Sequence, residues 1–205
     1  MDIASSITGF MFILSNALLY PVIIALIVLV VWVLVVLGQV VSEYSGRTRD
    51  FARLRDGCRD ARIQIQKREI GEAAQTLKNA GSNPLLEGYI GDIAGFIGDD
   101  RLTLESEKLL QDYELRITRE LDSLKLLIRI GPMLGLMGTL IPLGPALMGL
   151  SAGNIEALAT NLVVAFSTTV LGLLVGGIAY GVLLVKRRWY LQDLSDMEYV
   201  AGVLS

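Results

Sequence analysis

The sequence contains no histidine and only one cysteine, Cys58, among its 205 residues. A disulfide within one chain needs a second cysteine, and a structural zinc site draws its ligands from cysteine and histidine. Ser-His-Asp and Cys-His catalysis are excluded because both need histidine. The formal net charge of −3 gives no sign of a nucleic-acid partner. We therefore expect a protein with no metal, no cofactor and no nucleic-acid partner, and not an enzyme.

Charged residues are also missing from residues 18–41, where Gln39 is the only strongly polar residue. About 24 residues in a helix extend about 36 Å, which is enough to cross a bilayer. A cleaved signal peptide has basic residues before its apolar core, whereas Asp2 is the only charged residue before this one. We predict a retained transmembrane helix over residues 17–41. The outside segment before it, residues 1–16, fits either a short interfacial helix or a frayed end.

A second apolar stretch lies beyond the charged middle of the chain and contains Glu156 as its only charged side chain. A short polar segment divides it into two apolar runs, a pattern that indicates a helical hairpin. We predict transmembrane helices over residues 130–150 and 157–185, joined by an outside loop over residues 151–156. In this arrangement Asn154 caps the third transmembrane helix.

The distribution of basic residues predicts the orientation of these helices. All 18 lysines and arginines lie between residues 47 and 129 or at residues 186–188. Loops on the cytoplasmic side carry an excess of Lys and Arg. We therefore place the N-terminus and the hairpin loop outside, and residues 42–129 and the tail 186–205 in the cytoplasm. The predicted location is the cell (inner or cytoplasmic) membrane.

Residues 42–129 mix both signs of charge with apolar residues, as a soluble helical domain does. The stretch 43–80 has no proline and offers an intermittent apolar face, and residues 79–84 indicate a break. From residue 109 onward apolar residues recur every three or four positions, with no breaker before Pro132. We predict an all-α membrane protein with a helical cytoplasmic domain between the first and second spans. The second and third transmembrane helices extend into the cytoplasm.

Residues with little bulk recur every three or four positions in the last two spans, so they share one face of each helix. Small residues allow close helix contact in lipid, where no hydrophobic force drives association. These faces serve either simple packing or, with nearby polar groups, an ion path. In the second span they are Gly131, Gly135, Gly138, Pro142, Pro145 and Gly149, and in the third Ala165, Thr169, Gly172, Gly176 and Ala179.

Both of these spans also carry polar side chains near their middle. A single Thr hydroxyl can bond to its own helix and would mean little. Thr139 and Thr169, however, fall at comparable depth on antiparallel helices, which fits either a narrow polar path or packing. No acid or base lies within the spans, so a proton path would need a titrating group from another chain. The polar residues are Thr139, Asn161, Ser167, Thr168 and Thr169.

Two segments resemble motifs of the MotA/TolQ/ExbB proton-channel family. Residues 131–140, GPMLGLMGTL, are similar to its PLLGLLGTV signature, and residues 165–173, AFSTTVLGL, are similar to its third-helix ALxTTAxGL motif. The order of elements also agrees. Three spans resemble the ExbB/TolQ branch more than the four-span MotA branch.

The resemblance implies a homo-pentamer in membrane lipid, whose second and third helices surround the single membrane helices of partner subunits. Partners similar to ExbD, TolR or MotB would bring a membrane aspartate as the proton carrier. The resemblance places Thr139 and Thr169 at the pore, with Ser167, Thr168 and Asn161 as further candidates for the ion path. The packing or pore face would comprise Gly131, Pro132, Gly135, Gly138, Gly172 and Gly176.

Two departures from the family pattern concern the same helices. Val164 stands where bacterial members often have Glu, and Asn161, one turn earlier, is a candidate for that polar role. Pro142 and Pro145 follow the second-span motif, where each removes a helix hydrogen bond. These differences leave the choice between H⁺ and Na⁺ open.

These observations favour an ion-channel subunit, for protons, in an energy-transducing inner-membrane motor complex. Ion flow would be coupled to movement of a partner that carries a membrane aspartate. The alternative is a non-conducting oligomeric scaffold that anchors a cytoplasmic complex. A membrane enzyme is not favoured, because no convergent set of ionisable residues lies near the membrane.

Overall fold

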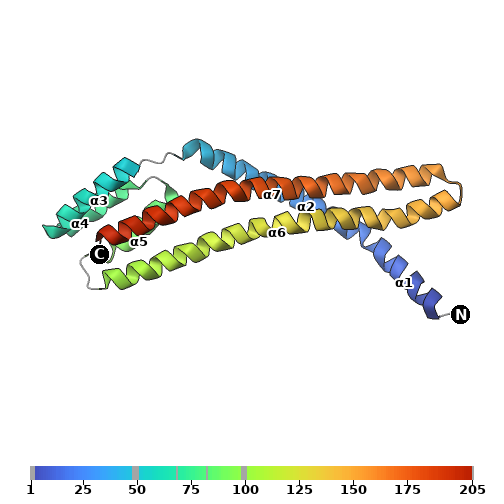
Figure 1. Ribbon diagram of the computed structural model, residues 1–205, viewed down its shortest axis with the longest axis horizontal. Coiled ribbons are helices and arrows are strands. Elements are labelled where there is room, and N and C mark those ends of the chain that lie inside the picture. The colour runs from blue at the N-terminus through green and yellow to red at the C-terminus, as the bar shows by residue number, and fades with distance from the viewer. Residues whose placement is uncertain (1–2, 48–50, 68, 82, 98–100, 205) are drawn as a thin grey trace. The chain divides into compact units, whose positions relative to one another are not determined.

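The computed structural model describes residues 3–47, 51–67, 69–81, 83–97 and 101–204, which form seven α-helices and no strand (Figure 1). The predicted all-α class is confirmed. The helices are α1 (Ile3–Ala17), α2 (Leu19–Gly46), α3 (Phe51–Gln66), α4 (Ile70–Ala80), α5 (Pro84–Ala94), α6 (Leu102–Ser151) and α7 (Ile155–Leu204).

Three helical segments are long and apolar enough to cross a membrane, as a multi-pass membrane protein requires. They are Ser6–Ser45, Leu102–Ser151 and Ile155–Leu204. The last two are α6 and α7, each of 50 residues. This is far more than the roughly 20 residues of one span. Each helix is therefore longer than a single span requires, as expected if both extend into the cytoplasm.

The chain divides into two compact units, and α6 and α7 contribute to both. The first, here called the apolar unit, comprises residues 1–40 and 123–183. The second, here called the polar unit, comprises residues 41–122 and 184–205. Each unit has its own buried residues, so each is described by itself.

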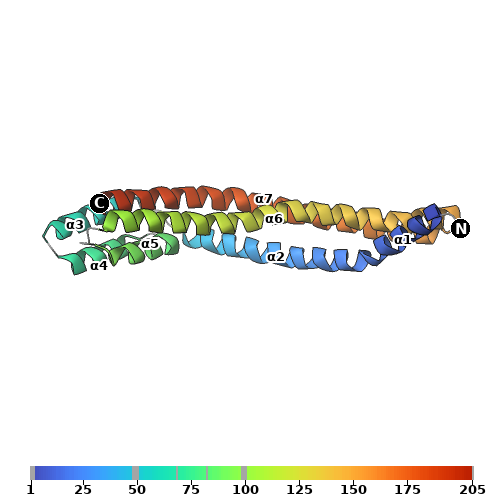
Figure 2. The same cartoon turned by 90° about the horizontal axis from the view of Figure 1, so that it is seen from below.

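In the apolar unit, α6 and α7 run antiparallel and side by side (Figures 1 and 2). Asn154 accepts a hydrogen bond from the Ala157 backbone N–H at 2.9 Å, which confirms it as the cap of α7. The residue before it, Gly153, has φ +74°, in the left-handed region that favours glycine. Three prolines, including Pro132, lie inside α6, yet the helix continues through all of them.

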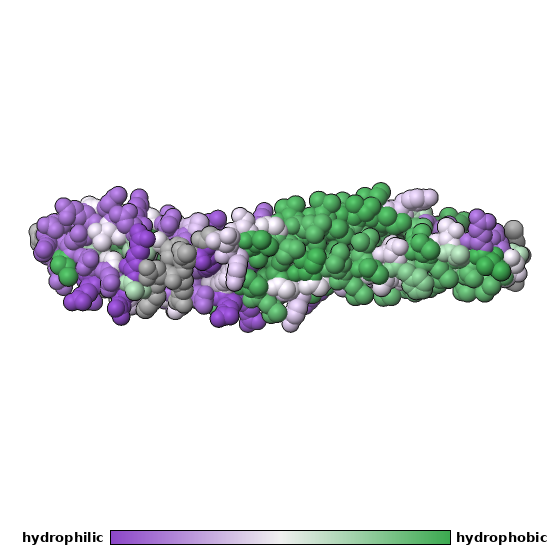
Figure 3. Space-filling view, turned by 90° about the horizontal axis from the view of Figure 1, so that it is seen from above, coloured by the Kyte–Doolittle hydropathy of each residue, from purple (hydrophilic) through white to green (hydrophobic). Residues whose placement is uncertain are grey.

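The outer surface of the apolar unit is covered by large apolar side chains (Figure 3). Leu140 of α6 and Phe166 of α7 are 60% and 66% exposed, and Tyr20 and Ile24 of α2 are similarly open. Such a surface is unfavourable in water and favourable in lipid or against another membrane helix. It is consistent with the predicted insertion of this unit into a bilayer.

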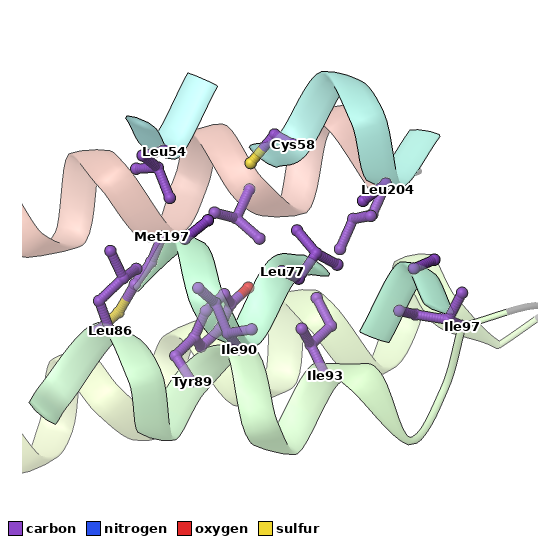
Figure 4. Close-up of a cluster of buried hydrophobic side chains, with 14 of the residues drawn as sticks. Leu54, Cys58, Leu77, Leu86, Tyr89, Ile90, Ile93, Ile97, Met197 and Leu204 are labelled. Atoms are coloured by element: carbon purple, nitrogen blue, oxygen red, sulfur yellow. The ribbon is translucent and has the colours of Figure 1, made fainter. Parts of the chain in front are cut away.

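The polar unit is built around a cluster of buried side chains from α3, α4, α5, the start of α6 and the end of α7. In Figure 4, Leu54 and Cys58 of α3 lie near Leu77 of α4, and the α5 residues point into the same core. The stretch 43–80 is broken in the structure, since α3 ends at Gln66 and α4 begins at Ile70. The fully buried members include Leu77, Leu86, Tyr89, Ile90, Ile93 and Met197.

Cys58 is expected to resist soluble thiol reagents until the polar unit unfolds. Its side chain is fully buried in this core, and burial raises the pKa of its thiol to about 11. The thiolate, which is the reactive form, is therefore scarce at neutral pH. Time-resolved mass spectrometry after iodoacetamide treatment measures this, with a Gln111→Cys variant, exposed on α6, as the accessible control. Equal labelling rates at the two positions under native conditions would contradict the buried placement.

Candidate functional site

The glycine faces of α6 and α7 meet each other inside the apolar unit. A Cβ placed on Gly172 of α7 would lie 2.5 Å from the carbonyl oxygen of Gly131 and 2.8 Å from the Cα of Gly135. Both distances are below 3.0 Å, a separation that real Cβ atoms essentially never show. The two backbones touch only because no side chain intervenes. Packing between α6 and α7 of one chain therefore uses these glycines.

Two further contacts fix the register of the same helix pair. A Cβ on Gly176 would lie 2.9 Å from Cγ of Pro132, and a Cβ on Gly138 would lie 2.6 Å from Oγ1 of Thr168. Thr168 is accordingly buried, with 5% of its surface exposed. Its hydroxyl donates to the Ala165 carbonyl at 2.9 Å. Thr168 is therefore a packing residue of the α6–α7 contact.

Thr139 and Thr169 lie on one edge of this pair and at the same depth. Thr139 follows Pro132 by seven positions and Thr169 precedes Gly176 by seven. Seven residues are about two helical turns, or about 10.5 Å. Because the helices are antiparallel, both steps lead in the same direction from the Pro132–Gly176 contact. Both side chains are partly exposed there, so the edge presents a pair of hydroxyl groups.

Each hydroxyl at this edge uses its proton on its own helix. Thr139 donates to the Leu136 carbonyl at 2.7 Å, and Thr169 donates to the Ala165 carbonyl at 3.3 Å. A hydroxyl has one proton and two acceptor lone pairs. What these threonines present to a neighbour is therefore hydrogen-bond acceptance. A protonated carboxyl group is a suitable donor for such a site.

The other polar candidates take different positions. Ser167 is exposed and precedes Thr169 by two residues, which turns it about 200° around the helix. Its hydroxyl donates to the Val163 carbonyl at 2.7 Å. Asn161 is partly buried, and its amide donates to the Ala157 carbonyl at 2.8 Å. The structure thus brings Thr139 and Thr169 together and leaves Ser167 on another face.

The Thr139–Thr169 edge contains no acidic residue of its own. Glu156 is the only carboxylate between residues 123 and 183, and it lies exposed in the first turn of α7. There an acidic side chain is stabilised by the helix dipole. This position is 13 residues before Thr169, about 20 Å along the helix. A proton that passes Thr139 and Thr169 therefore requires a carrier that this helix pair does not supply.

A second polar cluster, in the polar unit, has no counterpart among the residues selected from sequence. Arg47 forms an ion pair with Asp193 of α7, and Asn83 donates to the same carboxylate oxygen at 2.9 Å. These residues are far apart in the chain, and no spacing rule connects them. The one hint in the sequence is that Arg47 is the first basic residue after the first span.

The comparisons with known proteins agree with the motif resemblance. Residues 97–192 match the profile of the MotA/TolQ/ExbB proton channel family. The matched segment contains α6, the Thr139–Thr169 edge and most of α7. No curated protein matches the chain. The resemblance drawn from residues 131–140 and 165–173 is thereby confirmed.

Proposed function

We propose that this chain is a proton-channel subunit of an energy-transducing membrane complex, because residues 97–192 match the MotA/TolQ/ExbB proton channel family. The observation that supports this most directly is the hydroxyl pair at Thr139 and Thr169. Two partly exposed threonines at one depth of the α6–α7 pair are suited to receive a neutral carboxyl group. We assign no enzymatic role to the chain.

In this proposal the proton travels on a carboxylate of a partner helix. Protonation makes the carboxyl neutral, which lowers its cost in the apolar unit, and lets it donate a hydrogen bond to Thr139 or Thr169. Release of the proton restores the charge and drives the carboxylate away from the apolar surroundings. Each elementary charge that crosses releases about 2.3 kcal/mol per 100 mV of membrane potential. This energy is available to move the partner relative to the chain.

The complex we propose is a homo-pentamer of the ExbB/TolQ type around a partner with a single membrane span, similar to ExbD, TolR or MotB. The partner supplies the missing acid. The chain lies in the inner (cytoplasmic) membrane, with its N-terminus outside and its C-terminus in the cytoplasm. The support for this orientation is the absence of lysine and arginine from the first 46 residues and from residues 130–185.

A non-conducting scaffold is the second candidate, and one observation favours it. The five polar candidates each donate to a carbonyl of their own helix, and the glycine faces are occupied by contacts within the chain; the five are Thr139, Asn161, Ser167, Thr168 and Thr169. A membrane anchor for a cytoplasmic complex needs nothing more. The two candidates differ in whether ions cross.

Flux measurements in vesicles separate these two functions. The chain is reconstituted alone and together with a single-span protein that carries a membrane aspartate, and acidification is followed under an imposed potential. The channel proposal expects flux only with the partner present, and loss of flux when the partner's aspartate is replaced by asparagine. A stable complex without flux in any combination would establish the scaffold instead.

A further inference from the structure

Asp193 is a carboxylate buried in the polar unit, outside the predicted membrane spans. Its side chain retains only 3% of its exposure. Isolated charges are rarely buried, because removal from water costs several kcal/mol or more. The groups around Asp193 therefore decide which form of the carboxyl is stable.

Within the described part of the chain, one oxygen of Asp193 accepts all of its hydrogen bonds. Oδ1 accepts from the Arg47 guanidinium and from the Asn83 side-chain amide. Arg47 is itself held over the Trp189 ring at 5.0 Å, and it also donates to Glu43 at 3.0 Å. The guanidinium is thus shared between two carboxylates.

The other oxygen, Oδ2, is buried and has no hydrogen-bond partner among the described residues. An unsatisfied buried carboxylate oxygen costs free energy, and that cost is relieved when the carboxyl is neutral. The side chain also borders a cavity of about 330 Å³ that Glu43, Arg47, Arg116 and Tyr190 help to line. This volume gives water access to the neighbourhood of the carboxyl group.

Charged groups of both signs lie near Asp193. Glu43 comes from the last turn of α2 and Arg47 from the residue after that helix, and from α7 itself comes Asp196, which is also buried. Arg116 and Tyr113 of α6 line the same cavity. One guanidinium in direct contact therefore serves both Asp193 and Glu43. Burial raises the pKa of Asp193, Arg47 and Asn83 oppose that rise, and Asp196 adds to it.

We propose that Asp193 is a proton-binding site of the folded chain, and that its charge state sets how firmly Arg47 is held against α7. The proton comes from water and goes to Oδ2, because Oδ1 is occupied by Arg47 and Asn83. No other bond forms or breaks. Ionised Asp193 holds Arg47 by an ion pair, whereas neutral Asp193 leaves Arg47 to Glu43 and the Trp189 ring. The site lies on the chain itself and is separate from the carboxylate of a partner helix.

Infrared difference spectroscopy of the whole protein in detergent tests this directly. The carbonyl stretch of a protonated carboxyl group is to be followed between about pH 3 and pH 9, a range that brackets the ordinary titrations of Asp and Glu at about 3.9 and 4.3. We expect one protonated band, shifted by D₂O, that persists to higher pH than the bands of the exposed carboxyl groups and is absent from Asp193→Asn. Asp56→Asn, whose carboxylate is 69% exposed, is the matched control and should keep the band.

Two variants shift the titration in opposite directions and keep the test valid if Asp193→Asn fails to fold. Arg47→Met removes the cation and should raise proton affinity by about tenfold to a thousandfold. Asp196→Asn removes a like charge and should lower it. The same band in Asp193→Asn, or a titration unmoved by Arg47→Met, would overturn the proposal. Neither result depends on ion flux, so this inference can fail while the channel function stands.

Discussion

Gly172→Ala is expected to destabilise the chain by about 3 kcal/mol, whereas Gly177→Ala should be neutral or stabilising. The added methyl at residue 172 would lie 2.5 Å from the Gly131 carbonyl oxygen and 2.8 Å from the Gly135 Cα. Both obstacles are backbone atoms and cannot rotate away. The helices must separate, and overpacking of this kind costs about 1–3 kcal/mol or more.

Gly177 is a matched control because it lies on the same helix with nothing within 4 Å of an added Cβ. Ala is preferred to Gly inside a helix by about 1 kcal/mol, so this substitution should not destabilise the chain. Unfolding in mixed detergent, followed by circular dichroism and by limited proteolysis, measures both variants. Equal stability of the two would show that α6 and α7 do not pack through Gly131, Gly135 and Gly172.

The membrane helices could be predicted from the sequence because their signals are local. The absence of charge marked the spans, and Asn154 signalled the start of α7. The spacing of small residues in the last two spans was compatible with helix packing and with an ion path. The contacts of Gly172 and Gly138 assign those glycines to packing within one chain. The choice between packing and an ion path depends on which helix faces the small residues, and the spacing along one helix does not identify that facing helix.

The polar unit was less predictable, because its structure depends on contacts between distant residues. The proline-free stretch 43–80 gave no sign of the turn after Gln66, yet α3 folds back on α4 there. A Cβ on Gly57 would lie 2.5 Å from Cβ of Ala80, so a glycine permits this close approach. From the sequence alone Gly57 is merely an unfavourable helix residue. Its role becomes visible only when the facing helix is known.

For Thr139 and Thr169, the sequence predicted the depth in the membrane but not the shared edge of the helix pair. Comparable depth followed from counting residues along two antiparallel spans, but the shared edge required the contact of Pro132 with Gly176. The same register of contacts turns Thr168 inward and Ser167 outward, although Ser167, Thr168 and Thr169 are consecutive polar positions in the sequence. Arg47 and Asp193 could not be paired at all, since no local rule joins positions 146 residues apart.

Thr169→Val should reduce partner-dependent proton flux at least about tenfold while the complex still assembles. Valine keeps the branched shape and removes the acceptor oxygen. The hydroxyl's own donated bond, to Ala165 at 3.3 Å, is long and shares its acceptor with Thr168, so its loss costs little stability. Without this acceptor the neutral carboxyl group has an unsatisfied donor in apolar surroundings, which costs about 1–3 kcal/mol, and each 1.4 kcal/mol is a factor of ten. Thr139→Val should act in the same direction.

Thr160→Val is the control that distinguishes a pore role from a general loss of polarity. Thr160 is an exposed residue of α7 whose hydroxyl also donates to its own helix, to the Glu156 backbone carbonyl at 3.0 Å. The same substitution there removes the same atoms, but nine residues away. Flux is measured in vesicles with the single-span partner, and assembly by co-purification. The contradicting result is proton flux that survives both in Thr169→Val and in the double variant Thr139→Val/Thr169→Val. That result would mean that the partner's carboxyl group passes α6 and α7 without a hydrogen bond to either threonine hydroxyl. The hydroxyl edge would then be a by-product of helix packing, as in the scaffold.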